Sequence, residues 1–148
     1  MPSSRKAYTT MSRLVDETGT GAIIDLGSGW GTFVIRIAKR HPQRQVIGYE
    51  LSLLPWLISV LVKKILDLKN LTLYRADFYQ VRLPPAAVLV CYLFPAAMYD
   101  IEHKLLLDQA KVDFILSNNF ALPSSKPYKV LWLNDFFKSP IYLYRINH

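Results

Sequence analysis

The stretch Ala22-Ile23-Ile24-Asp25-Leu26-Gly27-Ser28-Gly29-Trp30-Gly31 decides how this chain folds. It joins an apolar run, of the kind that forms a buried strand, to an acid and three alternating glycines. Glycine allows the backbone to adopt unusual dihedral angles and to approach a ligand closely. A helix beginning near Thr32 would present its unbonded amide groups to the same place. This order of strand, acid, glycine turn and helix indicates a binding place for a small molecule.

Two further acids follow the next expected strands. Glu50 ends the strand predicted over residues 45–50 and lies 19 residues after Gly31. A carboxylate at that spacing can accept hydrogen bonds from both hydroxyls of a ribose. Asp77 follows the strand predicted over residues 71–76. Taken singly, Asp25 and Asp77 could cap turns and Glu50 could be a solvated strand end. Taken in order, the three acids favour a bound nucleoside.

The alternation of apolar segments predicts an α/β fold with a mostly parallel sheet. We expect helices over residues 5–18, 31–41, 54–68 and 95–109, and strands over residues 22–26, 45–50, 71–76, 86–92, 112–118, 128–134 and 140–146. The last two strands are joined by a short connection, which predicts an antiparallel hairpin at one edge. We therefore predict one domain over residues 1–148, with helices on both faces and one covering helix missing near the end.

Composition supports a folded protein with a substantial core. Of the 148 residues, 51% are hydrophobic and 20% are charged. The uncharged stretches 51–62 and 83–99 are shorter than the roughly 18 residues of a membrane-spanning helix, so we expect both to be core. The lone Cys91 lies in an apolar strand and predicts buried filler rather than a nucleophile. A single cysteine fits a reducing compartment, and we expect the protein in the cytoplasm.

The net charge of +7 would attract nucleic acid, anionic lipid or acidic proteins, without choosing among them. No interleaving of aromatic and basic residues resembles an RNA-binding module, so a nucleic-acid partner lacks support from the sequence. None of His41, His103 and His148 falls in a metal-ligand or catalytic-triad pattern. We therefore predict no metal site.

The pattern Asp-x-Gly-x-Gly-x-Gly after an apolar strand resembles motif I of the class I S-adenosylmethionine (SAM) methyltransferases. The glycine spacing differs from the G-x-G-x-x-G of dinucleotide sites. The resemblance implies a Rossmann-like sheet and SAM as cofactor. It also implies which residues bind each part of SAM. Gly27, Ser28, Gly29 and Gly31 would bind the methionine portion, and Asp25 would bind its ammonium. Glu50 with Leu51 would bind the ribose, and Asp77 with Phe78 the adenine.

Shorter motifs narrow the resemblance to a small protein-lysine methyltransferase family. The family includes mitochondrial enzymes acting on the ATP synthase c subunit and the adenine nucleotide translocase, and archaeal relatives. The motifs are Pro2-Ser3-Ser4-Arg5, Gly48-Tyr49-Glu50-Leu51, Pro55-Trp56-Leu57, Tyr92-Leu93-Phe94-Pro95, Asn119-Phe120-Ala121-Leu122-Pro123 and Ile141-Tyr142-Leu143-Tyr144. The resemblance implies a protein lysine as methyl acceptor, with Tyr92, Phe94 and Pro95 at the substrate mouth. Tyr92 is the catalytic candidate, because its oxygen could accept a hydrogen bond from the amine and orient it.

Other functions stay open from the sequence. An RNA or small-molecule methyltransferase is the first alternative, although Tyr92-Leu93-Phe94-Pro95 stands where many base methylators carry Asn-Pro-Pro-Tyr. A SAM-binding module without catalysis is the second, and nicotinamide binding is a distant third. The acceptor, the number of methyl groups transferred and the oligomeric state are not decided by the sequence.

Overall fold

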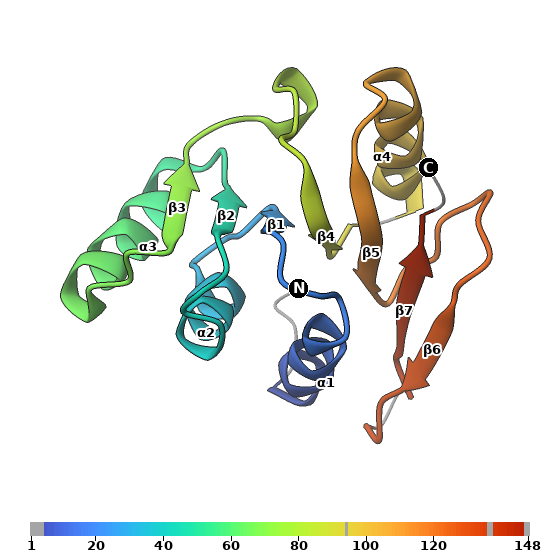
Figure 1. Ribbon diagram of the computed structural model, residues 1–148, viewed down its shortest axis with the longest axis horizontal. Helices are drawn as coiled ribbons and strands as arrows, with labels where there is room; N and C mark the ends of the chain where they lie inside the picture. The colour runs from blue at the N-terminus through green and yellow to red at the C-terminus, as the bar shows by residue number, and fades with distance from the viewer. Residues whose placement is uncertain (1–4, 94, 136–137, 147–148) are drawn as a thin grey trace.

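The computed structural model describes residues 5–93, 95–135 and 138–146. Seven strands form one sheet in the order β3-β2-β1-β4-β5-β7-β6 (Figure 1). Their bounds are β1 Ile23–Leu26, β2 Val46–Tyr49, β3 Leu71–Tyr74, β4 Ala86–Cys91, β5 Val112–Asn118, β6 Lys129–Trp132 and β7 Pro140–Arg145. Strands β1 to β5 pair in parallel, whereas β7 pairs antiparallel with both β5 and β6. The predicted fold class, with its C-terminal hairpin at one edge, is confirmed.

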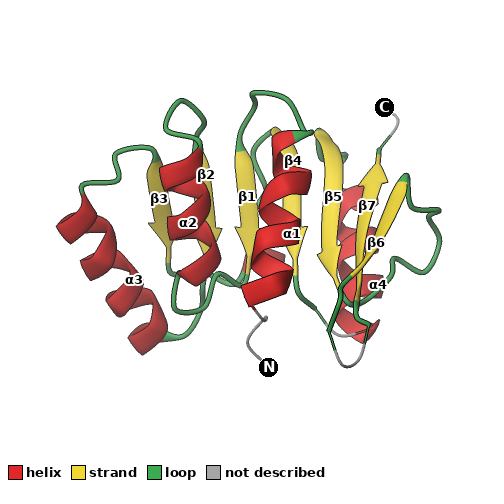
Figure 2. Ribbon diagram, turned by 90° about the horizontal axis from the view of Figure 1, so that it is seen from below, coloured by secondary structure: helices red, strands yellow, loops and turns green. Residues whose placement is uncertain are grey.

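Helices cover the two faces of the sheet unequally (Figure 2). Two helices, α1 Arg5–Asp16 and α2 Thr32–Arg40, lie on one face, and α4 Pro95–Leu107 lies on the other. Helix α3 Leu53–Leu66 lies beside β3 at the outer edge, and a short 3-10 turn, η1 Phe78–Gln80, follows β3. The segment between β5 and β6 contains no helix, as the sequence predicted.

The central strands of the sheet are shielded from water because helices cover both faces of the sheet. Every residue of β1 and of β4 is buried. Cys91, the last residue of β4, is fully buried, and burial raises the pKa of its thiol. A thiol in this state is a poor nucleophile, which confirms that Cys91 is structural.

One core prediction was wrong. Residues 51–62 were expected to be buried, yet Leu51, Leu54 and Leu61 are more than half exposed. The physical reason is the position of α3 at the sheet edge, where it packs through a narrow face onto β3 and α2. None of the described helices is long and apolar enough to cross a membrane.

Candidate functional site

A cleft lies at the carboxyl ends of β1 and β4, where the glycine turn leaves the sheet. Its cavity volume is about 200 Å³. Residues from β1, the turn, β4 and the first two helices line it: Tyr8, Met11, Asp25, Gly27, Ser28, Gly29, Trp30, Thr32, Phe33, Val90 and Tyr92. Parallel α/β sheets bind ligands outside the carboxyl ends of their strands, so this position matches the sequence prediction.

The glycine turn is anchored to the neighbouring strand. The amides of Gly27 and Ser28 both donate to the Tyr49 carbonyl oxygen, each at 2.9 Å. Gly27 and Gly29 have φ angles of +79° and +58°, where a side chain is strained, and a Cβ on either would meet no atom within 4 Å. These two glycines therefore keep an open side, while their left-handed backbone shapes the wall of the cleft.

Gly31 has a different role in the same turn. Its φ is +86°, and an added Cβ would lie 2.7 Å from Ser59 Cβ and 3.0 Å from Ile35 Cδ1. Real Cβ atoms do not approach so closely. Gly31 is therefore required by the packing of the turn against α3, whatever it does for a ligand.

Glu50 holds the turn from the next strand along the sheet. Its Oε1 accepts from the Gly29 amide at 2.8 Å, and its Oε2 accepts from the Ser52 amide at 2.9 Å. A carboxylate has about four acceptor positions, so two hydrogen bonds leave capacity for a ligand hydroxyl. Sequence reasoning found Glu50 but missed this structural role, because the role depends on how the turn folds back over β2.

Asp25 is the most perturbed acid of the cleft. Only 7% of its surface is exposed. Burial raises its pKa to about 7, and the nearby negative charge of Glu50 contributes to the rise. An acid that titrates near neutrality beside a cleft is typical of functional sites. It would ionise readily once a cation lay next to it.

Ser28 contributes a buried polar atom that the protein leaves unsatisfied. Its hydroxyl oxygen has no hydrogen-bond partner among the described residues, although buried hydroxyls are almost always paired. Ser28 lies in the turn between Gly27 and Gly29 and lines the cleft. A ligand with a polar group at this position would satisfy it.

The remaining predicted binding residues follow the neighbouring strands β2 and β3. Glu50, Leu51, Asp77 and Phe78 are outside the set of described residues that lines the cavity. Asp77 Oδ1 accepts from the Tyr79 amide at 3.0 Å and caps η1. This hydrogen bond agrees with the alternative interpretation of Asp77 as a residue that caps a turn. Phe78 is half-buried against the core beneath α4, and Leu51 is exposed.

The predicted substrate residues cluster after β4. Tyr92 is half-buried, lines the cleft and lies 6.3 Å from the Phe120 ring, centroid to centroid. Pro95 begins α4 and is exposed. Phe94, the third predicted residue, lies outside the described residues.

Sequence reasoning missed the contribution of the first helix. Tyr8 and Met11 of α1 line the cleft, and the Tyr8 ring stacks on Phe33 of α2 with centroids 5.8 Å apart. No local pattern in α1 indicates this, because the contact depends on how α1 packs on the sheet, where it lies over β5 and β7. Trp30 lies within the glycine motif itself and could have been included.

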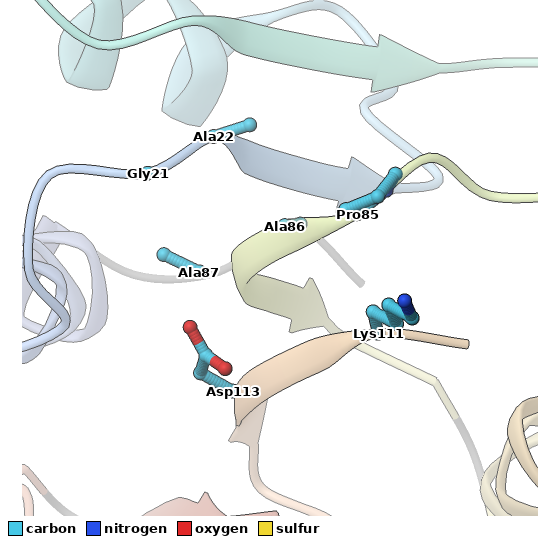
Figure 3. A pocket seen from close by; sticks show the side chains of 7 residues that line it. All are labelled: Gly21, Ala22, Pro85, Ala86, Ala87, Lys111 and Asp113. Atoms are coloured by element: carbon cyan, nitrogen blue, oxygen red, sulfur yellow. The ribbon is translucent and has the colours of Figure 1, made fainter. Parts of the chain in front are cut away.

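A second hollow lies at the opposite end of the same strands (Figure 3). Its volume is about 530 Å³, larger than that of the cleft. It is lined by the starts of β1, β4 and β5, with short side chains such as Ala22, Ala86 and Ala87 and two charged residues, Lys111 and Asp113. Its described lining residues include no helix start and no buried side-chain polar atom without a partner, so its size alone does not make it a binding site.

Comparison with known proteins now identifies the family. The model of the ANTKMT methyltransferase domain matches residues 25–129, which is more than half of the chain. The chain belongs to this family. The matched range begins at Asp25 and includes the glycine turn, Glu50, Asp77 and Tyr92. The chain is therefore a methyltransferase domain of the ANTKMT family, and the sequence predictions of family and cofactor are confirmed.

Two curated relatives differ in how far their likeness extends. The mouse adenine nucleotide translocase lysine N-methyltransferase is 28% identical over 132 residues, covering 87% of this chain and 56% of that protein. A tRNA (guanine-N(7)-)-methyltransferase of Lactiplantibacillus plantarum is 39% identical over 56 residues, covering 36% of this chain and 25% of that protein. The ANTKMT-family domain described here thus spans little more than half of the first and a quarter of the second.

A solved structure confirms the fold. The RNA methyltransferase from Salinibacter ruber, crystallised with S-adenosyl-L-homocysteine, superposes with a TM-score of 0.85 at 20% sequence identity. The match covers 100% of this chain and 95% of that one. The cleft of the ANTKMT-family domain also fits SAM on its own features. The unsatisfied Ser28 hydroxyl, the open sides of Gly27 and Gly29, and the buried acid Asp25 suit a ligand that carries polar groups and an ammonium.

Proposed function

We propose that this domain transfers a methyl group from SAM to the side-chain amine of a protein lysine. The observation that carries the proposal is the extent of the likeness to the mouse lysine N-methyltransferase, which covers 87% of the chain. The likeness to tRNA methyltransferases covers 36% and 37% of the chain. A segment of that length can hold a nucleoside-binding motif, whereas acceptor specificity resides in the rest of the chain.

In this proposal the acids at the strand ends hold the cofactor. Asp25 faces the ammonium of the methionine portion, and that positive charge keeps its carboxylate ionised. Ser28 donates to or accepts from the same portion, which satisfies its buried hydroxyl. Glu50, with Leu51 beside it, binds the ribose hydroxyls through its remaining acceptor positions. Asp77 and Phe78 bind the adenine, by hydrogen bond and by apolar contact respectively.

Methyl transfer from SAM requires the protein to position the two reactants, and it depends less on acid or base groups. SAM supplies a methyl carbon already activated by its sulfonium. Bound SAM would supply that carbon to the lysine nitrogen and would leave as a neutral thioether that needs no proton, so the residues of the cleft would only have to position the two molecules. The amine must be neutral to attack, and its ordinary pKa is about 10.4. The aromatic surroundings of Tyr92 and Phe120 withdraw it from water, which favours loss of its proton to solvent. The Tyr92 oxygen then accepts a hydrogen bond from the amine and directs its lone pair.

An RNA acceptor is the second candidate. Local likeness to tRNA (guanine-N(7)-)-methyltransferases favours it, and so does the net charge of +7. A basic surface binds phosphate backbones without sequence preference, so charge alone supports RNA contact and not base methylation.

Incubation of the purified domain with tritiated SAM and a lysate of its source organism separates the candidates. We expect label in macromolecules that withstands nuclease, is released by protease, and appears as methyl-lysine after acid hydrolysis. Label that withstands protease and is released by nuclease would replace the lysine proposal with the RNA one. Absence of transfer, with SAM binding retained in calorimetry, would indicate a binding module.

The role of Tyr92 has its own test. Tyr92→Phe removes the hydroxyl and keeps the ring, so we expect kcat to fall about tenfold while the Kd for SAM stays the same. Tyr99→Phe is the matched control, because Tyr99 lies exposed on α4, away from the cleft lining. An unchanged kcat in Tyr92→Phe would leave Tyr92 as a wall of the cleft only.

A further inference from the structure

Helix α3 turns an apolar face outward. Five of its side chains, spaced three or four residues apart, form one continuous stripe with exposed fractions between 37% and 77%. We refer to this stripe as the α3 surface; it consists of Leu54, Leu57, Ile58, Leu61 and Ile65. Exposed apolar residues are common singly, but a contiguous stripe of this kind marks an interaction surface.

The inner face of the same helix explains why the stripe points outward. Ser59 is the buried residue of α3, and it packs on Gly31 of the glycine turn. On the same side, Trp56 donates its indole N–H to the Leu73 carbonyl oxygen of β3 at 3.1 Å. The helix is therefore fixed by a small and partly polar contact, and its larger aliphatic side chains are left exposed.

The charges on helix α3 itself are of one sign, because it carries Lys63 and Lys64 and no acid. The adjoining segments carry two more cations, Lys69 and Arg75, and the acids Glu50, Asp67 and Asp77. Oδ2 of Asp67 lies 4.0 Å from Nζ of Lys69, close enough to offset part of that cation's charge. Lys64 follows Leu61 by three residues and borders the stripe, whereas Lys63 follows Ser59 by four residues and lies on the inner side of the helix. An aliphatic stripe with a cation at its border fits an interface that is apolar at its centre and anionic at its rim.

We propose that the α3 surface binds an anionic lipid bilayer. The helix lies in the plane of the membrane interface, with its stripe at the boundary of the acyl chains and its lysines toward the phosphate groups. A second copy of the chain fits less well, because a symmetric pairing of α3 would bring the lysines of two helices together, and α3 itself carries no acid to oppose them.

The apolar exposure continues from α3 to the edge of the cleft. Leu51 and Tyr74, at the ends of β2 and β3, are 59% and 49% exposed, and Trp30 of the glycine turn is 55% exposed. Tyrosine and tryptophan favour the membrane interface. Since α3 begins three residues after Glu50, binding through the α3 surface would hold the cleft beside the bilayer.

Co-sedimentation with vesicles tests this inference. We expect the wild-type chain to bind vesicles of phosphatidylcholine and phosphatidylglycerol at least tenfold more tightly than vesicles of phosphatidylcholine alone. Leu61→Gln with Ile65→Gln should weaken binding about tenfold, and so should Lys63→Gln with Lys64→Gln. These residues are outside the cleft lining, so SAM calorimetry and circular dichroism should show that the variants remain folded.

Matched controls lie elsewhere on the surface. Leu106→Gln with Leu107→Gln removes two side chains of α4 that are 75% and 70% exposed, and Lys111→Gln with Lys126→Gln removes two exposed charges. Both controls should bind within twofold of wild type. Absence of binding by the folded wild-type chain would overturn the proposal, and so would equal losses in the controls. A wild-type dimer in sedimentation velocity that Leu61→Gln with Ile65→Gln dissociates, without any lipid binding, would assign the surface to a second copy. None of these outcomes depends on the methyl acceptor.

Discussion

The sheet is hollowed at both ends of its parallel strands, and the two hollows differ in chemistry as well as in size. At the amino ends, the buried Arg44 donates to the carbonyl oxygens of Gly21 and Val15 and to the Thr18 hydroxyl. At the carboxyl ends, Asp25 is buried with a raised pKa and the Ser28 hydroxyl has no partner among the described residues. None of the described residues that line the larger hollow has a buried side-chain polar atom without a partner, whereas the smaller hollow has polar groups available to a ligand.

The largest expected difference between the two ends concerns stability and pH. The pKa of Asp25 is about 7 in the folded state and near 3.8 in the unfolded state. Between these values the folded state holds a proton that the unfolded state lacks, so the free energy of unfolding falls as pH rises. Over the interval from about pH 4 to pH 7 this loss amounts to about 3–4 kcal/mol. Urea denaturation of wild type and Asp25→Asn across that interval measures it as the difference between the two profiles.

Asp113→Asn, at the amino ends, is the control for that experiment, and its profile should keep the wild-type slope. Parallel profiles for wild type and Asp25→Asn would show that Asp25 is ionised at the same pH in both states, and would remove the main electrostatic contrast between the two ends.

The same pair of variants separates the ends by ligand affinity. Asp25→Asn removes the charge that we assign to the ammonium, so SAM should bind about 30- to 100-fold more weakly at about pH 8. Asp113→Asn should bind within about twofold of wild type. Wild-type affinity should also rise between about pH 6 and pH 8, because binding of a cation requires an ionised Asp25. Isothermal titration calorimetry measures all three, and equal affinities in the two variants would contradict the assignment of the cleft.

Glycines provide a third contrast. Gly31→Ala places a Cβ 2.7 Å from Ser59 at a φ of +86°, so we expect a loss of about 2–3 kcal/mol in unfolding free energy. Gly21→Ala, at the amino ends, places its Cβ 3.0 Å from Ala87 Cβ without a positive φ, and should cost less than about 1 kcal/mol. Thermal and urea denaturation rank the two. A reversed order would show that the glycine turn tolerates side chains that the opposite end does not.

The smallest effect concerns Asp77, whose present hydrogen bond caps η1. Asp77→Ala should lower the unfolding free energy by about 1 kcal/mol, whereas Asp77→Asn keeps an acceptor and should leave it nearly unchanged. If Asp77 also binds adenine, both variants weaken SAM binding several-fold in calorimetry. Wild-type affinity in both would leave Asp77 as a cap, and the ligand-binding end would then be limited to β1, β2 and β4.

Much of this fold was predictable because its signals are local. The run before Asp25 predicts β1, the glycines predict the turn, and the close spacing of the last two strands predicts their hairpin. The site was less accessible. Tyr8 reaches the cleft only through the crossing of α1 over the sheet, and the Glu50 hydrogen bonds to the Gly29 and Ser52 amides depend on how two loops meet. The outward face of α3 was not predicted, because an apolar helix is expected to be buried until the elements that pack against it are known.

The contact between Gly31 and Ser59 has an evolutionary consequence. The turn and α3 meet where both residues are small, and the closeness of Ser59 leaves no room for a side chain at Gly31. Substitution at one position is therefore constrained by its partner, although 27 residues separate them along the chain. Descendants of the same ancestor should keep both positions small, or change them together while the outer helix moves outward.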